Sequence, residues 1–160
     1  MTDHLWSPWR MQYIQEAKEE PDDGGCVFCS IPQTETDRVL LLGDLAYVVL
    51  NKFPYNPGHL LVVPLRHVGD LEAVTAEENG ELQALLQRSL AAIRRTSDPA
   101  GFNVGLNLGR IAGAGIPGHL HWHVVPRWSG DTNFMPVVGQ TRVLPELLAE
   151  TYVRLKPGFE

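Results

Sequence analysis

The sequence predicts an α+β domain, with an antiparallel sheet of about five strands, one long helix and a C-terminal helix. Three patterns carry this prediction. Short runs of β-branched and aromatic residues, separated by turn residues, fill residues 38–65. Leucines at helical spacing follow Thr75. Residues 119–125 then alternate histidine with apolar side chains, as a strand with one polar face does.

Length and composition predict a single domain over residues 1–160. The hydrophobic content of 44% is enough for a substantial core. The net charge of −6 argues against a general nucleic-acid binder, although a local basic patch can still bind an anionic substrate. No apolar run approaches the roughly 18 residues of a membrane span. Because Met1–His4 lacks the features of a signal peptide, we expect a cytoplasmic protein without a membrane partner.

Residues 1–25 are interpreted as an N-terminal aromatic arm. Trp6, Trp9 and Tyr13 cluster within it, and exposing three aromatic rings to water is unfavourable. The arm is therefore expected to pack on its own domain or on a second subunit, or to offer a platform for an adenine ring.

Cys26 and Cys29 follow the arm. Such a pair fits half of a zinc site, a redox pair or two buried thiols. A thioredoxin-like motif would need a preceding strand, and the turn-forming residues 22–25 do not predict one. A structural zinc site needs four ligands, so two more would have to come from elsewhere in the chain.

Residues 38–65 predict an antiparallel meander. Val39–Leu42, Ala46–Leu50 and His59–Val63 are apolar runs bounded by glycine, proline, asparagine or aspartate. His59 stands at the entrance of the third strand, where a histidine is either an exposed turn residue or the wall of a site.

Residues 75–97 predict the long helix. Thr75 and Glu78 fit a capping box at its start. The apolar residues at helical spacing are Leu82, Leu85, Leu86, Leu90 and Ile93. Arg94 and Arg95 suit the negative end of the helix dipole. We expect this helix to serve packing rather than chemistry.

Phe102–Asn107 predicts a further strand, and a glycine-rich loop separates it from the histidine run. Spacing by two places His119, His121 and His123 on one strand face, and Pro126 is expected to end this strand. Glycine amides can cradle phosphate, so this neighbourhood predicts an anion site. Three histidines on one face equally fit a catalytic zinc with three protein ligands.

Residues 129–160 are interpreted as a C-terminal extension. We expect a loop over residues 131–136 and a short strand at Val137–Val138. A helix is predicted near Leu144–Leu155, starting at Pro145, since proline suits the first helical position.

The pattern His-φ-His-φ-His-φ-φ, with φ apolar, is met from His119 to Val125, and it resembles the histidine triad (HIT) family of nucleotidyl hydrolases and transferases. The resemblance covers residues 26–128 closely and includes the segments Cys26–Cys29, Asn56–His59, Pro64–His67 and Pro126–Arg127. The outer segments Leu5–Met11 and Trp128–Phe134 resemble the branch that contains diadenosine tetraphosphate phosphorylases. The resemblance implies a HIT-like fold and a homodimer.

The resemblance also implies a role for each candidate site residue. His121 would attack the α-phosphorus of a nucleotide and form a nucleotidyl-histidine, with His123 and His59 stabilising charge beside it. The residues that would bind substrate are Asn107, Gly113, Gly115, Gly118 and Arg127. The residues that would hold a structural zinc, which the chemical step does not need, are Cys26, Cys29, His67 and His119.

Two acceptors could resolve such an intermediate. Water would make the protein a hydrolase, whereas inorganic phosphate would make it a phosphorylase, and the outer segments favour the phosphorylase. The loop Ala114–Gly118 lacks the glutamine or serine that many HIT proteins place before the first histidine, so backbone amides are the expected donors, or water is the acceptor. The alternatives are a hydrolase of nucleoside phosphoramidates or other AMP conjugates, and a nucleotide-binding protein with little turnover.

Overall fold

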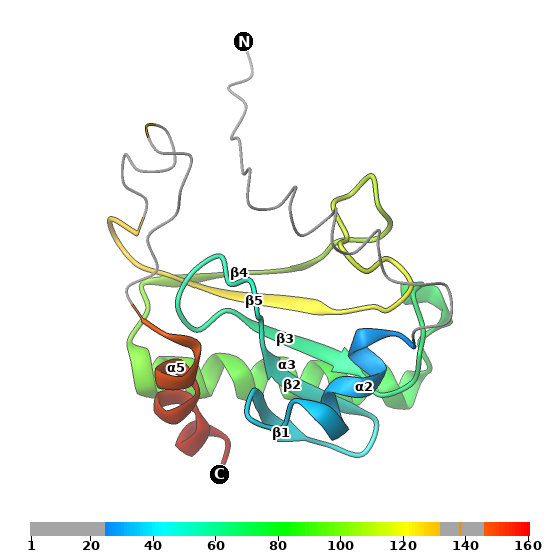
Figure 1. Ribbon diagram of the computed structural model, residues 1–160, viewed down its shortest axis with the longest axis horizontal. Coiled ribbons are helices and arrows are strands. Elements are labelled where there is room, and N and C mark those ends of the chain that lie inside the picture. Colours follow the sequence, from blue (N-terminus) through cyan, green and yellow to red (C-terminus); the bar gives the residue numbers. More distant parts are fainter. Residues whose placement is uncertain (1–24, 132–137, 139–145) are drawn as a thin grey trace.

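The computed structural model describes residues 25–131, 138 and 146–160, and these form a five-stranded antiparallel sheet with helices packed against it (Figure 1). The strands are β1 (Val39–Leu42), β2 (Ala46–Leu50), β3 (Leu60–Pro64), β4 (Gly101–Leu106) and β5 (Trp122–Arg127), in the spatial order β1-β2-β3-β5-β4. The helices are α2 (Val27–Thr34), α3 (Ala76–Ser97) and α5 (Leu148–Leu155), with 3-10 turns η1 (Leu71–Ala73) and η2 (Lys156–Phe159). The predicted α+β fold is confirmed.

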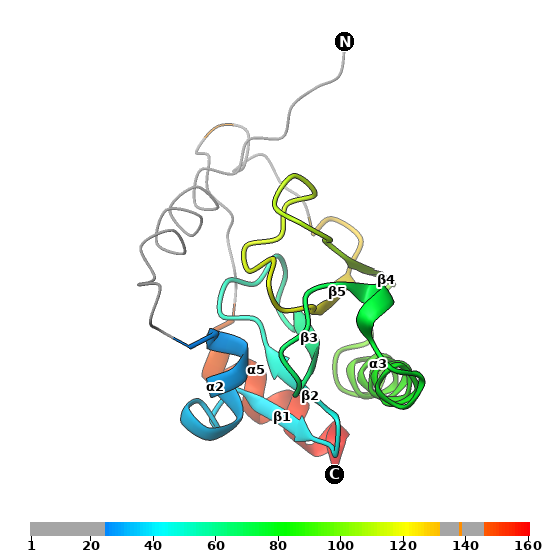
Figure 2. The same cartoon turned by 90° about the vertical axis from the view of Figure 1, so that its right-hand side faces the viewer.

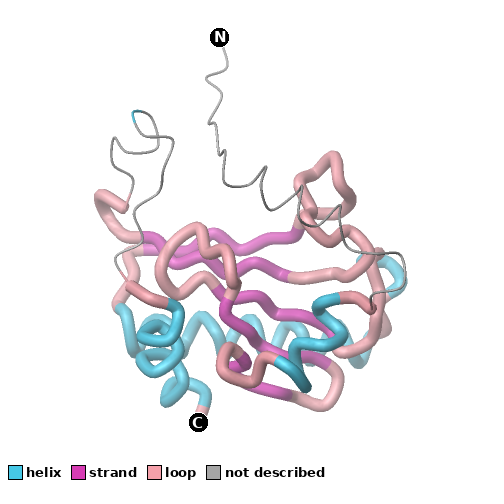
Figure 3. The backbone as a smooth tube through the Cα atoms, in the orientation of Figure 1, coloured by secondary structure: helices cyan, strands magenta, loops and turns pink. Residues whose placement is uncertain are grey.

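The meander over residues 38–65 is confirmed, since β1 pairs with β2 and β2 with β3, all antiparallel. The third strand begins one residue later than predicted, at Leu60, so His59 lies at its mouth. Two long connections, residues 51–59 before β3 and residues 107–121 before β5, stand outside the ladder (Figure 3). They carry most of the side chains discussed below.

Strands β2 and β3 are buried on both faces of the sheet. Alternate residues of β2 and β3 enter different cores: Val48 and Val62 face the core under α3, whereas Tyr47 and Val63 face the core under α2. Figure 2 shows α2 and α3 on opposite sides of the sheet. This explains why both strands read as continuous apolar runs although the sheet is antiparallel, because neither face meets water.

The long helix α3 forms as predicted. Thr75 accepts a hydrogen bond from the Glu78 amide, and the Glu78 carboxylate accepts one from the Thr75 amide, which completes the capping box. The helix ends at Asp98, which adopts a left-handed conformation with φ of 44°. Its apolar stripe packs on the sheet, so the expectation of a packing role is consistent with its burial.

Helix α2 has no local signal in the sequence that predicts it. Pro32 lies inside it and no side chain caps its start, and both features disfavour a helix. Pro32 lacks the N–H that would bond to the carbonyl of Phe28, and the buried hydroxyl of Tyr47 donates to that carbonyl instead, at 2.7 Å. Phe28 and Ile31 bury one face of the helix in the core, so tertiary packing holds this short segment in place.

The predicted strand over residues 119–125 was wrong at both ends, because β5 runs from Trp122 to Arg127. β4 ends at Leu106, which pairs with Trp122, and the pairing of β3 with β5 also stops at Trp122, although β3 itself continues to Pro64. Pro126 is tolerated within β5 because β3 pairs only with Trp122–Val124. At Pro126 that side of β5 faces Asn56, whose side chain donates to the Pro126 carbonyl at 2.9 Å.

The C-terminal helix exists but begins at Leu148 rather than at Pro145. Glu146 and Leu147 precede it, and the Glu150 carboxylate accepts the Leu147 amide at 3.0 Å, which marks the helix start. Leu155 and the Phe159 ring of η2 join the core under α3, so residues 146–160 pack on their own domain.

Several predictions concern residues outside the described part of the chain. They are the aromatic arm before residue 25, the loop at 132–136 and Val137 of the strand predicted at Val137–Val138. The strand prediction was wrong at Val138, which is described and is helical. Among the described residues, no helix is long and apolar enough to cross a membrane.

Candidate functional site

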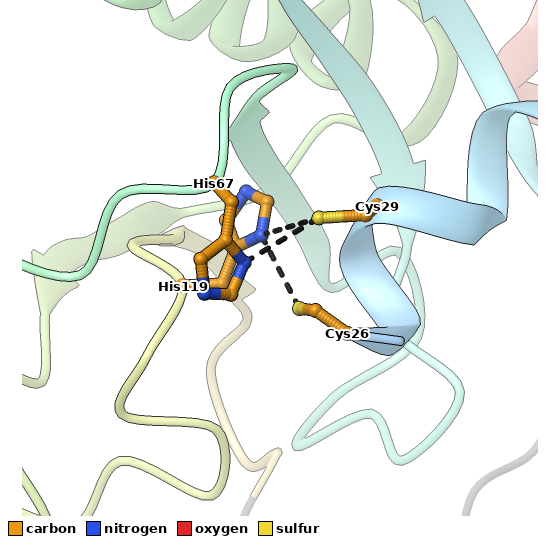
Figure 4. A group of neighbouring side chains, drawn as sticks. All are labelled: Cys26, Cys29, His67 and His119. Atoms are coloured by element: carbon orange, nitrogen blue, oxygen red, sulfur yellow. Dashed lines mark hydrogen bonds between the residues drawn. The ribbon is translucent and has the colours of Figure 1, made fainter. Parts of the chain in front are cut away.

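Four side chains from three distant segments meet at one edge of the sheet. Cys26 and Cys29 open α2, His67 follows β3, and His119 lies before β5 (Figure 4). Their ligand atoms all lie within 4.8 Å of one another. Nδ1 of His119 lies 3.3 Å from Sγ of Cys26 and 3.5 Å from Sγ of Cys29, and Nδ1 of His67 lies 3.4 Å from Sγ of Cys29. This group could hold a metal ion.

The donor set suits a tetrahedral thiolate–imidazole site. Zn–S bonds of about 2.3 Å and Zn–N bonds of about 2.0 Å at tetrahedral angles place sulfur and nitrogen about 3.5 Å apart, close to the distances above. Nε2 of His119 donates to the Pro64 carbonyl at 2.8 Å, which leaves Nδ1 without a proton and available as a ligand. Burial and the Cys26 thiol raise the pKa of Cys29, and a bound cation would offset that cost.

A type II turn places His59. Asn56 and Pro57 open the turn, Gly58 has φ of 79°, and the His59 amide donates to the Asn56 carbonyl at 3.1 Å. Only glycine adopts this φ without strain, so the sequence Asn-Pro-Gly dictates the turn. The turn buries the His59 ring completely at the mouth of β3.

Three histidine rings gather beside this turn. Nε2 of His59 lies 2.9 Å from Nδ1 of His123, and the rings of His121 and His123 lie 5.1 Å apart, centroid to centroid. Tyr55 stacks on His123 with an interplanar angle of 12°, and its centroid lies 4.7 Å from that of His59. Phe28 of α2 packs on His121 at 4.7 Å. The three predicted catalytic histidines are therefore neighbours.

The orientation of His121 is set by the main chain. Its Nδ1 donates to the carbonyl of His119 at 2.8 Å, so in the neutral ring Nε2 carries a lone pair. Burial lowers the pKa of His121, and the hydrogen bond to His119 opposes this shift. A neutral imidazole is therefore favoured at physiological pH, which is the form that can act as a nucleophile.

Asn107, Gly113, Gly115 and Gly118 lie in the connection between β4 and the histidine segment. Asn107 directly follows β4 and is next in register to His121, because Leu106 pairs with Trp122. Gly113 has φ of 95°, and its amide closes a turn on the carbonyl of Arg110 at 3.0 Å. Gly115 and Gly118 lie further along the same loop, which leads into His119. The loop thus connects β4 to His119, with its Gly113 amide engaged within a turn.

Arg127 lies in an internal ion pair. Its Nε and one terminal nitrogen donate to the two carboxylate oxygens of Asp131, at 2.6 and 2.9 Å, and its other terminal nitrogen donates to Asn103 at 2.7 Å. This ion pair holds the pKa of Asp131 well below its usual range. Asn56 donates to the same carboxylate at 2.8 Å, which ties the turn before His59 to the end of β5.

Sequence reasoning missed several residues that position the site, namely Phe28, Asn51, Tyr55, Asn56 and Asp131. Asn51 and Asn56 are both residues typical of turns, and nothing in a single sequence separates a turn asparagine from one that also orients a histidine. Gly69 is a further example. A Cβ at this position would lie 2.8 Å from the Pro117 carbonyl, so glycine permits the close approach of the two segments that carry His67 and His119.

Comparisons with known proteins agree on one family. Residues 33–130 match the model of the HIT domain. An AP-4-A phosphorylase of Mycobacterium tuberculosis is 48% identical over 154 residues, which are 92% of this chain and 79% of that protein. The crystal structure of a Zn-bound histidine triad family protein from Mycobacterium smegmatis has a TM-score of 0.69 at 29% identity and covers 84% of this chain and 93% of its own.

A mutant uridylyltransferase shares the fold, with a TM-score of 0.75 at 20% identity over 95% of this chain and 53% of that one. The family model spans more than half of the sequence, and the M. tuberculosis relative matches nearly all of it. The histidine pattern, the sheet topology and these matches agree, and the chain belongs to the HIT domain family.

Proposed function

We propose that this protein is an enzyme that cleaves dinucleoside polyphosphates, diadenosine tetraphosphate above all, with inorganic phosphate as the acceptor. The observation that carries the proposal is the orientation of His121, whose Nδ1 is held by the His119 carbonyl while its Nε2 keeps a lone pair. Binding alone does not require such a nucleophile. The 48% identity to an AP-4-A phosphorylase supports the choice of substrate and acceptor.

In the proposed reaction Nε2 of His121 forms a bond to the α-phosphorus, and the bond from that phosphorus to the bridging oxygen breaks. ATP departs with the electron pair, leaving an adenylyl group on His121. Phosphate then attacks the same phosphorus, the bond from phosphorus to Nε2 of His121 breaks with its electron pair returning to the nitrogen, and ADP is released, whereas attack by water would release AMP. His123 donates to the oxygens on which charge develops, supported by His59.

We assign substrate contacts to Asn107 and to the loop of Gly113, Gly115 and Gly118, which adjoin the histidines. The assignment of Arg127 to phosphate binding has less support, because its contacts with Asp131 and Asn103 occupy all three guanidinium nitrogens. Arg127 would then contribute to substrate binding indirectly, because it holds Asp131, which in turn bonds to Asn56 in the turn before His59.

We propose zinc as the ion of the Cys26, Cys29, His67 and His119 group. The thiolate and imidazole donors and their spacing suit it, and the M. smegmatis relative is named as Zn-bound. Zinc bound there would link α2 to the segment before β5 and would take no part in phosphoryl transfer. The alternative of a catalytic zinc on His119, His121 and His123 is disfavoured because, among the described residues, the metal-capable group includes His119 but neither of the others.

We further propose a homodimer, as the family resemblance implies. β4 is an edge strand and Val104 on it is 44% exposed, so this edge is accessible in the part of the chain that the structure describes. A cytoplasmic location is part of the same proposal.

The proposal is tested by product analysis with diadenosine tetraphosphate, with and without inorganic phosphate. ATP and ADP formed only with phosphate are the expected result. ATP and AMP formed without phosphate would make the protein a hydrolase instead. Mass spectrometry of the protein quenched during turnover should find one adenylyl group, on His121.

His121→Ala provides the control. Loss of the nucleophile should lower turnover at least about a thousandfold and remove the adenylylated species. His123→Ala should slow formation of the adduct without abolishing it, since it removes a hydrogen-bond donor and leaves the nucleophile. Undiminished turnover by His121→Ala would contradict the proposed mechanism.

A further inference from the structure

Phe28 lies between the two cysteines of the metal-capable group and packs on the proposed nucleophile. It belongs to the first turn of α2, between Cys26 and Cys29. Its ring centroid lies 4.7 Å from that of His121, with the ring planes 39° apart, and 5.5 Å from that of His119, in an edge contact. The Phe28 side chain is 5% exposed. One buried side chain therefore touches both the nucleophile and a member of the metal-capable group.

Two contacts together determine how the ring of His121 lies. The hydrogen bond from its Nδ1 to the His119 carbonyl holds one atom of the ring, and a ring held at one atom can still turn about that bond. Phe28 packs on the ring and limits this turning. The direction of the lone pair on Nε2 depends on it. Attack on phosphorus requires that lone pair to be aligned with the bond that breaks, so a small rotation of the ring lowers the rate.

α2 depends on groups outside it for its position. It has eight residues, contains Pro32 and has no side-chain cap at its start, so its own backbone gives it little stability. The Phe28 carbonyl accepts the Tyr47 hydroxyl at 2.7 Å, and the Phe28 ring is buried in the core. The cysteine pair is a further anchor, since both sulfur atoms lie within 3.5 Å of Nδ1 of His119.

His119 has supports that do not depend on α2. Its Nε2 donates to the Pro64 carbonyl at 2.8 Å, and the amide of Leu120 donates to the Val68 carbonyl at 2.7 Å. An ion bound to the metal-capable group would therefore hold α2 against a histidine that is already fixed, with a thiolate ligand on each side of Phe28. The support of the nucleophile that responds most to ion binding is then the ring of Phe28.

We propose that Phe28 is a positioning residue for His121 and that metal binding at the metal-capable group accelerates adenylyl transfer through Phe28. The inference rests on the proposed adenylyl transfer to His121 and adds the regulation of that step. The ion stays outside the chemical step and acts by holding the first turn of α2. Metal binding then affects the rate of the step more than the affinity for substrate, because it places the attacking nitrogen rather than the nucleotide.

The first test compares Phe28→Leu with Ile31→Ala in the full-length protein loaded with zinc. The two changes remove the same number of carbon atoms from the same helix and the same core, but only Phe28→Leu removes the aromatic ring. The rate of adenylyl-His121 formation from diadenosine tetraphosphate is measured in single turnover at several substrate concentrations.

Phe28→Leu should lower the rate at saturating substrate at least about tenfold, since a misplacement of about 1 Å can cost roughly 100-fold. The half-saturating concentration should change by less than about threefold, and Ile31→Ala should stay within about threefold of wild type in both quantities. A smaller loss of rate in Phe28→Leu, equal slowing by the two variants, or a loss confined to substrate affinity would overturn the positioning role.

Chelation tests whether the ion acts through Phe28. Zinc is removed from each protein at a temperature at which circular dichroism shows that it remains folded. Wild type should then lose about as much rate as Phe28→Leu does, and added zinc should restore it. Phe28→Leu should lose less than about threefold more on chelation, because the ring through which the ion acts is already absent. No effect of chelation on wild type, or two losses that multiply, would overturn the coupling.

The orientation of His121 is measured without substrate, by NMR of protein labelled with ¹⁵N-histidine. Its Nδ1 proton is hydrogen-bonded and the residue is 8% exposed, so this proton should exchange slowly with water in the zinc-loaded wild type. Exchange should be faster in Phe28→Leu and in chelated wild type, and unchanged in Ile31→Ala. Equal exchange in all of these samples would overturn the inference, whatever the activity. Failure of His121 to become adenylylated would overturn the proposed function, and the exchange rates would still decide the role of Phe28.

Discussion

At the scale of single residues, main-chain groups set the chemistry of four histidines. The Pro64 carbonyl orients His119, the His119 carbonyl orients His121, and the Tyr55 amide orients His59, which in turn orients His123. Each contact assigns one ring nitrogen as donor or acceptor and so decides whether the other can bind a metal, attack phosphorus or donate. The identity of the side chain alone does not determine this.

Asn56 is the residue through which the turn before His59 is tied to β5, and its truncation should be costly. Its side chain is 2% exposed and donates to the Pro126 carbonyl and to Asp131. Asn56→Ala removes one donor from each of these acceptors, so we expect the free energy of unfolding to fall by about 1–3 kcal/mol. Urea unfolding measures it.

Asn103→Ala is the matched control for this change. Asn103 also bonds to Arg127 but lies at the exposed surface. Asn103→Ala should therefore lower the free energy of unfolding by no more than roughly 0.5 kcal/mol. Equal effects of the two variants would show that burial does not govern the contribution of this network.

At the scale of elements, short segments depend on contacts that lie outside them. α2 contains Pro32 and persists because the Tyr47 hydroxyl replaces the missing N–H and because Phe28 and Ile31 are buried. The segment 119–121 is held by its neighbours rather than by a strand ladder, since the Leu120 amide donates to the Val68 carbonyl at 2.7 Å. By contrast, α3 carries its own start signal.

That start signal predicts a pH dependence of stability. The hydrogen bond from Arg66 lowers the pKa of Glu78 from 4.5 to about 2, helped by the amide of Thr75. A lowered pKa means that the folded state favours the carboxylate, so this stabilisation is complete above about pH 5 and is lost as the pH falls from 4.5 towards 2.

Glu78→Gln isolates the charge, because glutamine keeps the cap on Thr75 and loses the ion pair. Arg66 is 48% exposed, so the variant should be less stable at pH 7 by no more than about 1 kcal/mol. The difference from wild type should shrink towards zero near pH 2, as followed by urea unfolding at each pH. A difference that is constant with pH would contradict the ion-pair explanation.

At the scale of the whole molecule, the metal-capable group connects segments that lie far apart in sequence. Cys26 and Cys29 come from α2, His67 from the loop after β3, and His119 from the approach to the catalytic histidines. An ion bound there stabilises the folded state alone, because the unfolded chain does not bring these ligands together.

Removal of zinc should therefore lower the thermal stability of the protein. At free zinc of about 1,000 times the dissociation constant, linkage adds about 4 kcal/mol, which a chelator should remove. Differential scanning calorimetry with and without chelator measures the shift in Tm. The Tm of Cys29→Ser should already be low without chelator and should change little when chelator is added. A wild-type Tm that does not change on addition of chelator would contradict a structural ion.

Much of the fold could be predicted from local signals. The boundaries of β1 and β2 were predicted to the residue and the capping box of α3 was identified, because turn formers and caps act within a few residues. The predictions failed where distant partners decide. β5 starts at Trp122, where β4 ends and the pairing with β3 stops although β3 continues to Pro64. Pro126 is tolerated because the Asn56 side chain takes the place of a paired strand there, and α2 persists because the Tyr47 hydroxyl donates to the Phe28 carbonyl.

The sequence by itself determined which chemical groups the site contains. The histidine pattern, the cysteine pair and the Asn-Pro-Gly turn carried the family resemblance and led to the candidate residues. Only the tertiary structure decided which nitrogen of each ring is available, that His119 faces the cysteines whereas His123 faces His59, and that Arg127 is paired with Asp131. The physical reason is that a proton position depends on hydrogen-bond partners, which here lie as far away in sequence as Pro64 from His119 and His59 from His123.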